Sequence, residues 1–410
     1  MRQAAELARE QDTARSSVDE YRQELQSFVR ERIAGRADEI EQRADFPRAL
    51  FAALGARGFY ERCIDLRKDG HRFIPLDLAR YRVLIEELAR STCFSLALPV
   101  SVHVGLCLPL LARLGTATLR EDMLPRALRG ELVGAIAATE SRAVSGADFV
   151  AMASRATITD RGIRLQGFKD YITSGMAADF LVTFVPWRDP AHFTDICAVV
   201  VPTAQPGVRR TPVPMSVFRS AGIAHFDFDG VELDRTALLG RQHFGMSYFL
   251  EHMLVARLDA GIWAVAVGQE ALLLMQRYAQ SRQVGDGTLW GESAVQLRFA
   301  EAATRLELLR GLVDSTIRAA EETGRIDPVA ATAIKAATPG CAGAVLEETL
   351  HLLGARGLET RRPLLRMLAE LRSFGLAGGS TEVMLRVLAE LWPARRSGDA
   401  QEGIYPEWRA

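Results

Sequence analysis

Side chains that could move a proton are scattered along the sequence, and few of them lie close together in it. A general base must reach its proton directly and have a suitable pKa, so carboxylates and histidines are the candidates. Glu251, His252 and Asp259 fall within one stretch of helical character, and Glu382 follows a glycine-rich turn. His103 lies in an uncharged apolar run, where we expect a buried imidazole with hydrogen-bonded ring nitrogens rather than a base.

No common nucleotide-binding or metal-binding motif accompanies these residues. The sequence has no G-x-G-x-x-G after a predicted strand, no Walker lysine loop and no H-E-x-x-H. The five cysteines occur without a C-x-x-C pair, so we expect reduced interior thiols and no metal site. The net charge of −1 gives no reason to expect nucleic acid or a membrane surface as a partner. A nucleotide cofactor would therefore bind outside a Rossmann crevice.

One apolar run is long enough to resemble a membrane span. Residues 93–112 contain no Asp, Glu, Lys or Arg, but they include Pro99, His103, Pro109 and several serines. This composition suits helices buried against other helices better than helices in lipid. The N-terminal residues MRQAAELAREQDTARSS are charged throughout and lack the apolar segment of a secretory signal, so we expect a cytoplasmic protein.

Hydrophobic periodicity divides the chain into three zones and a tail. Helical spacing in the first zone changes to short alternating runs punctuated by prolines in the second, and helical spacing returns in the third. We therefore expect the α+β class, with an N-terminal helical domain, a middle antiparallel β domain and a C-terminal four-helix bundle. The expected boundaries are residues 1–133, 134–245 and 246–395, with a polar tail at 396–410.

Local signals refine the second and third zones. Asp160-Arg161-Gly162 lies between alternating runs and predicts a hairpin turn. Apolar residues from Val295 to Val313 recur at three- and four-residue steps and predict a long bundle helix. Asp327-Pro328 is a good N-cap and first position for the next helix, and Pro339-Gly340 predicts a kink or break within it.

The order of the zones and three motifs in register resemble the acyl-CoA dehydrogenase family over roughly residues 20–395. Each motif is weak alone, and the resemblance depends on their order and separation. The motifs are LGTATLREDMLPRALRGELVGAIAATES, QGFKDYITSGMAADFLVTF and LLGARGLETRRPLLRMLAELRSFGLAGGSTEVMLR. The resemblance implies the family fold, bound FAD and the oxidation of an acyl thioester.

The same resemblance implies a set of FAD contacts. Tyr171 and Thr173 match the strand beside the isoalloxazine ring, where an aromatic side chain covers the flavin and a hydroxyl donates to N5. Thr139 matches a threonine at the flavin pyrimidine. Arg282 matches an arginine that reaches the FAD phosphates across a subunit interface, where its fork of donors suits anionic oxygens. The other implied contacts are Ser145, Gly146, His351, Gly354, Gly379, Ser380 and Glu382.

The sequence departs from the family at the catalytic base. Most members carry a glutamate at the position that matches Gly378, and others carry it at the position that matches Ala256. Neither glycine nor alanine can accept a proton. Asp259 is the preferred substitute because helix positions three apart are neighbours, and the candidates named above are alternatives. Changes at several cofactor contacts, such as His351 in place of a glutamine, predict weaker FAD binding or dependence on a partner subunit.

Three functions remain open at this stage. The first is an FAD-dependent dehydrogenase of an acyl group held on CoA or a carrier protein, with a relocated base or an already acidic substrate. The second is a base-less subunit of a heteromeric acyl-CoA dehydrogenase, whose partner supplies the glutamate. The third is a flavin-dependent monooxygenase, which the intact motif around Thr173 disfavours. The resemblance also implies a homo-oligomer, either a tetramer or a dimer.

Overall fold

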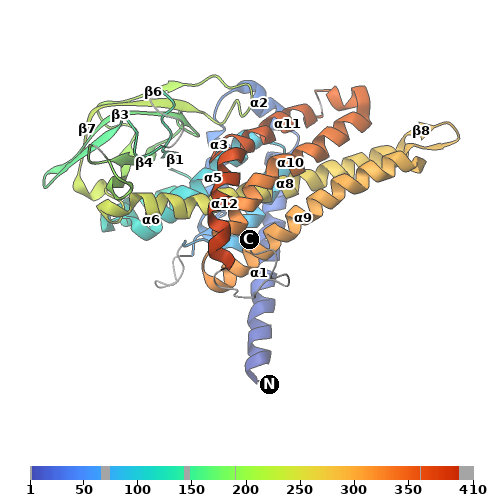
Figure 1. Cartoon of the computed structure of the whole chain (residues 1–410), viewed down its shortest axis with the longest axis horizontal. Helices are drawn as coiled ribbons and strands as arrows, with labels where there is room; N and C mark the ends of the chain where they lie inside the picture. The colour runs from blue at the N-terminus through green and yellow to red at the C-terminus, as the bar shows by residue number, and fades with distance from the viewer. Residues whose placement is uncertain (1, 66–73, 143–147, 190, 361, 397–410) are drawn as a thin grey trace, which may run out of the picture.

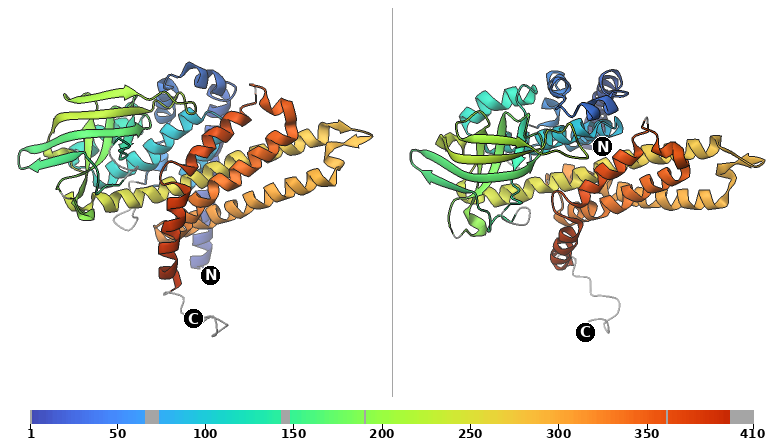
Figure 2. Two further views of the ribbon diagram at one scale, coloured as in Figure 1. Left: turned by 45° about the horizontal axis from the view of Figure 1, so that its top comes forward. Right: turned by 90° about the horizontal axis from the view of Figure 1, so that it is seen from above.

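A β domain at one end of the molecule and a helical bundle at the other make up the fold, with the N-terminal helices packed between and below them (Figure 1). The computed structural model describes residues 2–65, 74–142, 148–189, 191–360 and 362–396. Helix α8 (Gly245–Ser281) starts beside the β domain and runs into the bundle, as both views of Figure 2 show. This arrangement confirms the predicted α+β class.

The N-terminal part consists of helices that enclose the uncharged run. The helices are α1 (Arg2–Arg32), α2 (Ala37–Arg43), α3 (Arg48–Ala56), α4 (Leu78–Arg90), α5 (Phe94–Val102), α6 (Leu108–Leu114) and α7 (Leu124–Leu128). A π-helical turn at His103–Cys107 joins α5 to α6. Three described segments are long and apolar enough to span a membrane, and the first of them, Phe94–Leu114, is 89% buried in this fold. Interior packing therefore explains the uncharged run.

Two sheets share one buried cluster in the β domain. One sheet has the order β1 (Gly134–Ala137), β4 (Phe180–Pro186), β5 (Ile196–Pro202), and the other has the order β2 (Arg155–Thr159), β3 (Gly162–Ile172), β7 (Ala224–Leu233), β6 (Val208–Pro212). Thr159 pairs with Gly162, which confirms the hairpin turn. The prediction of a wholly antiparallel domain is wrong, because β1 pairs with β4 in parallel across a long crossover.

The C-terminal bundle contains α8, which has 37 residues and is the longest helix in the described part of the chain. It comprises α8, the hairpin β8 (Gln283–Val284) and β9 (Gly287–Thr288), α9 (Ser293–Thr323), α10 (Pro328–Leu353), α11 (Leu364–Arg372) and α12 (Thr381–Arg396). The predicted stripe on α9 is largely buried against the bundle, with Leu306 and Val313 almost fully covered. Asp327 caps α10 by accepting from the Val329 N–H at 2.9 Å, as predicted.

Helix α10 continues through Pro339 without a break. Of the predicted kink or break, the break is therefore wrong, and the kink stays a prediction. A proline removes one backbone hydrogen bond and crowds the preceding turn. Helix α10 tolerates this because α8, α9, α11 and α12 all pack against it. Tertiary packing outweighs the local preference.

Candidate active site

The end of β3 presents an exposed aromatic ring beside a hydroxyl. Tyr171 is 52% exposed and has a φ of 54°, in the left-handed region, and Thr173 follows it half-buried. The Asp170 N–H donates to the carbonyl oxygen of Thr139 at 2.8 Å, which places the segment after β1 beside this strand end. Strained backbone of this kind persists only where the surrounding structure holds it, and it is common at functional sites.

One buried ion pair and one partly exposed ion pair hold this strand end in place. Lys169 Nζ lies 2.9 Å from Glu140 Oε1, and both side chains are fully buried. Burial lowers the pKa of Lys169 to about 8. The neighbouring Asp170 accepts from the Ser141 N–H at 2.8 Å and from the Arg142 Nε–H at 2.9 Å. Burial acts to raise the pKa of Asp170, but these hydrogen bonds outweigh it and the pKa is lowered. Breaking the buried Lys169–Glu140 pair would leave an uncompensated charge, so this pair holds the strand end firmly.

These features fit the predicted FAD site. Tyr171 offers an open ring face, and Thr173 offers a hydroxyl next to it. Ser174 also has a left-handed φ of 64°, and its buried hydroxyl has no hydrogen-bond partner in the described part of the chain. An unpaired buried hydroxyl beside an exposed aromatic ring is suited to a flat, polar-edged ligand. Ser145 and Gly146 lie outside the described residues.

Other predicted FAD contacts lie far from Tyr171 in the same chain. Arg282 is exposed and directly precedes the β8–β9 hairpin, at the end of the molecule opposite the β domain (Figures 1 and 2). His351 is exposed near the end of α10, and Gly354 follows that helix with a φ of 56°. One chain does not bring Arg282 to Tyr171. Their separation is what a contact across a subunit interface would require.

The turn before α12 contains Gly378, one of the two positions where the sequence resemblance predicts that a base is missing. Gly378 and Gly379 have φ angles of 68° and 98°, and any side chain at these positions would be strained. Ser380 caps α12 by accepting from the Val383 N–H at 3.3 Å. Glu382 is exposed, and a hydrogen bond from its own N–H lowers the pKa of its carboxyl. A Cβ atom added to Gly378 would meet only Lys335 Cε, at 3.8 Å.

Lys335 lies beside Gly378, and Arg257 is close enough to Lys335 to affect it electrostatically. Lys335 on α10 is 3% exposed, and its Nζ donates to the carbonyl oxygens of Phe374 and Gly379. Arg257 on α8 donates from Nη1 to Thr332 Oγ1 at 2.9 Å, and its buried Nε has no partner among the described residues. Burial, with the charge of Arg257 nearby, lowers the pKa of Lys335 to about 8. Burial also lowers the pKa of Arg257.

Asp259 lies on a different side of α8 from this cation pair. Its carboxyl is 4% exposed, accepts from the Ser101 hydroxyl of α5 and is also bonded to Tyr81 of α4. Burial raises the pKa of Asp259 to about 7. The Asp259 carboxyl is thus buried and engaged by side chains of α4 and α5. The predicted role of Asp259 as substitute base is therefore not supported by its position.

The other candidate bases are also engaged by the fold. His252 is 1% exposed, its Nδ1 is 2.8 Å from the Tyr248 carbonyl oxygen, and burial lowers its pKa to about 4. His103 is likewise buried: its Nε2 lies 3.0 Å from the Ala127 carbonyl oxygen and its Nδ1 accepts from the Gly134 N–H. This confirms His103 as a satisfied neutral imidazole.

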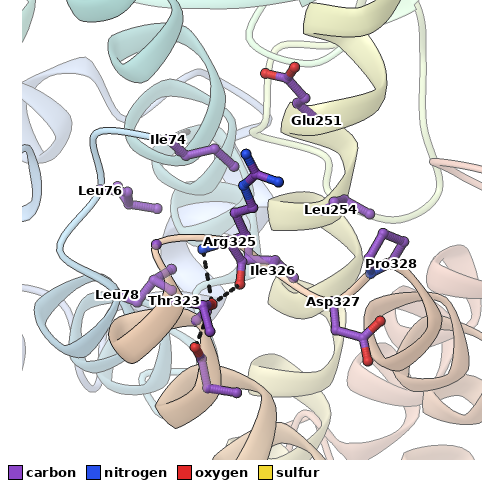
Figure 3. A pocket seen from close by; sticks show the side chains of 13 residues that line it. Ile74, Leu76, Leu78, Glu251, Leu254, Thr323, Arg325, Ile326, Asp327 and Pro328 are labelled. Carbon is purple, nitrogen blue, oxygen red and sulfur yellow. Dashed lines mark hydrogen bonds between the residues drawn. The ribbon is translucent and has the colours of Figure 1, made fainter. Parts of the chain in front are cut away.

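Glu251 lines an apolar cavity of about 480 Å³ (Figure 3). The cavity lies between the start of α8, residues 74–78 and the turn from α9 to α10. Burial raises the pKa of Glu251, and its carboxylate lies 2.7 Å from Arg113 Nη1. The lining residues Leu254 and Pro328 precede Arg257 and Thr332 by about one helical turn on their respective helices. The cavity and the cation pair are therefore neighbours.

Reasoning from the sequence missed the pairing of Arg257 with Lys335. The two residues are on different helices, and no local spacing relates them. One signal was available: Lys335 is the only charged residue in the apolar run from Pro328 to Leu346. A single lysine in such a run is either buried for a reason or reaches a functional site.

Family models match both helical parts of the chain. The model described as "Acyl-CoA dehydrogenase, N-terminal domain" matches residues 16–131, and "Acyl-CoA dehydrogenase, C-terminal domain" matches residues 243–391.

Curated relatives extend over nearly the whole chain. The benzylmalonyl-CoA dehydrogenase of Aromatoleum aromaticum is 29% identical over 379 residues, which cover 91% of this chain and 98% of that protein. The acyl-[acyl-carrier-protein] dehydrogenase MbtN of Mycolicibacterium paratuberculosis is 25% identical over 392 residues, which cover 93% and 96%.

Solved structures share the fold. Butyryl-CoA dehydrogenase from Megasphaera elsdenii superposes with a TM-score of 0.84 at 21% identity, over 92% of this chain and 98% of that chain. A structure described as "PigA with FAD and proline" has the same TM-score of 0.84 at 18% identity, with the same 92% and 98% coverage.

Proposed function

Because the chain belongs to the acyl-CoA dehydrogenase family, an FAD-dependent class of oxidoreductases, we propose that it dehydrogenates an acyl thioester without a side-chain base at either usual position. The observation that carries this proposal is the place beside Gly378. A Cβ atom at Gly378 would meet Lys335 Cε, and among the described residues neither Lys335 nor the nearby Arg257 is paired with a carboxylate. The dehydrogenation must then be completed by something that the substrate provides.

The β domain would hold the reactive part of FAD. When bound, FAD supplies the acceptor for the hydride that leaves the β-carbon of the substrate. Tyr171 would cover one ring face, and the Thr173 hydroxyl would donate a hydrogen bond at the ring edge. The segment at Thr139 would contact the pyrimidine edge, held beside the strand by its bond to Asp170. These roles leave proton removal from the α-carbon unassigned.

The relatives support a thioester as the substrate. One of them is named for benzylmalonyl-CoA and another for an acyl group on a carrier protein, so the shared element is an acyl thioester on a phosphopantetheine arm. We propose the same class for this chain. The apolar cavity beside the cation pair has a volume of about 480 Å³, within the size range of small-molecule sites.

A base-less subunit of a heteromeric dehydrogenase is the second candidate. The observation that favours it is the same uncompensated pair, Arg257 and Lys335, because a carboxylate from a partner chain could neutralise them. No observation favours the monooxygenase, which has no need of a cation pair at the base position.

We further propose that the chain assembles with copies of itself. The position of Arg282, far from Tyr171 of its own chain, supports a contact with the FAD of a second subunit. Leu297 and Leu308 on α9 are 66% and 73% exposed, and exposed apolar residues on a bundle helix are suited to an interface.

The first experiment is an absorbance spectrum of the purified chain, followed by denaturation and identification of any released cofactor. We expect a flavin spectrum with about one FAD per chain and a symmetric oligomer by light scattering. Anaerobic addition of an acyl thioester should then bleach the flavin. A colourless protein that takes up no added FAD would contradict a stand-alone enzyme and would favour the heteromeric alternative.

A further inference from the structure

Arg257 and Lys335 are two largely buried positive charges that no carboxylate of the described residues neutralises. The polar partners of Lys335 are the carbonyl oxygens of Phe374 and Gly379, and the partner of Arg257 is the Thr332 hydroxyl. Removing a charge from water without an opposite charge is costly. Two such cations within range of each other add repulsion, which is why burial together with Arg257 lowers the pKa of Lys335. The site is therefore incomplete without an anion.

The space for that anion is at the two empty base positions. Ala256 directly precedes Arg257 on α8, and a Cβ atom at Gly378 would lie 3.8 Å from Lys335 Cε with no other atom within 4 Å. A carboxylate at Gly378 would thus be close to Lys335, which in turn feels the charge of Arg257. The buried Arg257 Nε–H, which has no partner among the described residues, is a donor available to it.

We propose that Arg257 and Lys335 bind a carboxylate carried by the α-carbon of the substrate, which makes the substrate class a 2-carboxyacyl thioester. The inference rests on the proposed function, because it assumes a thioester oxidised by bound FAD. An arginine and a lysine suit this task, since both are donors without acceptor capacity and bind carboxylate oxygens strongly.

This substrate class explains why no base is required. The bond between the α-carbon and the carboxylate carbon breaks, and the carboxylate leaves as CO₂. The electron pair of that bond forms the double bond between the α- and β-carbons, while the β-carbon loses its hydride to the two-electron acceptor, FAD. The α-hydrogen stays on the product. Loss of CO₂ thus replaces the removal of a proton, and atoms and electrons balance without any side chain that accepts a proton.

The cation pair acts in recognition and orientation rather than in bond cleavage. An ion pair stabilises the carboxylate before it leaves, which alone would slow the loss of CO₂. Lys335 limits this effect because two carbonyl oxygens already occupy its ammonium group. Arg257 and Lys335 are therefore specificity and positioning residues. They select thioesters that carry a free carboxylate on the α-carbon, and they fix the orientation of the bond between that carboxylate and the α-carbon.

Equilibrium binding tests the inference without turnover. Malonyl-CoA and acetyl-CoA differ by one carboxylate, and neither has a hydrogen on a β-carbon, so neither can be dehydrogenated. We expect calorimetry on the FAD-loaded protein to show malonyl-CoA binding at least about tenfold more tightly than acetyl-CoA. Arg257→Gln and Lys335→Met should each remove most of this preference, and Arg257→Lys should restore part of it.

The matched control is Arg298→Gln, which removes an arginine paired with Glu348 elsewhere in the bundle. It should leave the preference for malonyl-CoA unchanged. Equal affinity for malonyl-CoA and acetyl-CoA in the wild type, or no binding of malonyl-CoA by a chain that holds FAD, would overturn the inference. If the Lys335 variant does not fold, the two Arg257 variants still decide the question.

Matched substrates separate this inference from the proposed function. Butylmalonyl-CoA and hexanoyl-CoA differ only in the carboxylate on the α-carbon, as do benzylmalonyl-CoA and 3-phenylpropionyl-CoA. We expect the carboxylated member of at least one pair to bleach the flavin at least about a hundredfold faster. If the member without the carboxylate is faster, the proposed function holds and this inference fails. If no member of either pair bleaches bound FAD, both fail.

Discussion

Replacing Asp259 with asparagine should make the protein increasingly more stable than the wild type as pH rises. The carboxyl of Asp259 is 4% exposed, and its bonds from Ser101 and Tyr81 do not replace the water that it loses. Burial raises its pKa from the ordinary 3.8 to about 7. The folded protein therefore holds this proton more tightly than the unfolded chain does.

The sign and size of the effect follow from that difference. The unfolded carboxyl ionises near pH 4 and the folded one near pH 7, so the free energy of unfolding falls across this window as pH rises. A shift of about three pKa units corresponds to about 4 kcal/mol. Asparagine does not titrate. The stability of Asp259→Asn relative to the wild type should thus grow by about 4 kcal/mol between about pH 4 and pH 8.

Denaturant unfolding at several pH values, with FAD in constant excess, measures this difference. The asparagine amide also needs a hydrogen-bond acceptor, and lacking one would cost the same stability at every pH. This cost would shift all the measured differences in unfolding free energy equally and leave their dependence on pH unchanged. Asp234→Asn is the matched control. The exposed Asp234 carboxylate accepts from the Thr236 N–H, which lowers its pKa. The stability of Asp234→Asn relative to the wild type should therefore fall as pH rises. A flat difference for Asp259→Asn would refute the burial of an ionisable carboxyl between α4, α5 and α8.

Three further predictions concern the flavin strand, the empty base position and the interior. Thr173→Ala should change the flavin spectrum and slow flavin reduction while leaving the unfolding midpoint nearly unchanged; reduction at the wild-type rate would contradict the flavin assignment. Gly378→Glu should lower stability by about 1–2 kcal/mol because of the left-handed φ of 68°, yet raise activity on simple acyl-CoAs, as flavin bleaching would show. His103→Phe should lower the free energy of unfolding by about 2–4 kcal/mol, because the Gly134 N–H and the Ala127 carbonyl oxygen lose their partner; an unchanged denaturation midpoint would contradict this.

Much of the fold could be predicted because its signals are local. The change from helical to alternating periodicity marked the β domain, the Asp160-Arg161 turn appeared as a hairpin, and Asp327 appeared as a cap. The errors concern interactions between distant segments. Strand β1 pairs in parallel with β4 although many residues separate them, and the packing of α10 on its neighbours outweighs the effect of Pro339. Neither contact leaves a mark in the sequence near these residues.

The candidate site likewise has some features with a local signal in the sequence and others that depend on contacts between distant segments. The motif at Tyr171 was visible as a short strand, but the left-handed φ of Tyr171 lies in the bulge where β3 pairs with β7. The sequence also showed that Gly378 and Ala256 cannot act as bases. It could not show that Lys335 lies beside Gly378, or that Arg257 approaches Lys335, because this requires the packing of α8 against α10. The proposed role of these two cations therefore depends on the three-dimensional structure.

The most direct test of the central claim is the amount of CO₂ released in a single anaerobic turnover of the FAD-loaded protein with butylmalonyl-CoA or benzylmalonyl-CoA labelled in the free carboxylate. Dehydrogenation without a side-chain base predicts one labelled CO₂ for each FAD reduced, with an enoyl thioester as the product. Reduction of FAD with no CO₂ released would show that a proton is removed from the α-carbon instead, and it would mean that a base exists which the positions of Gly378 and Ala256 do not reveal.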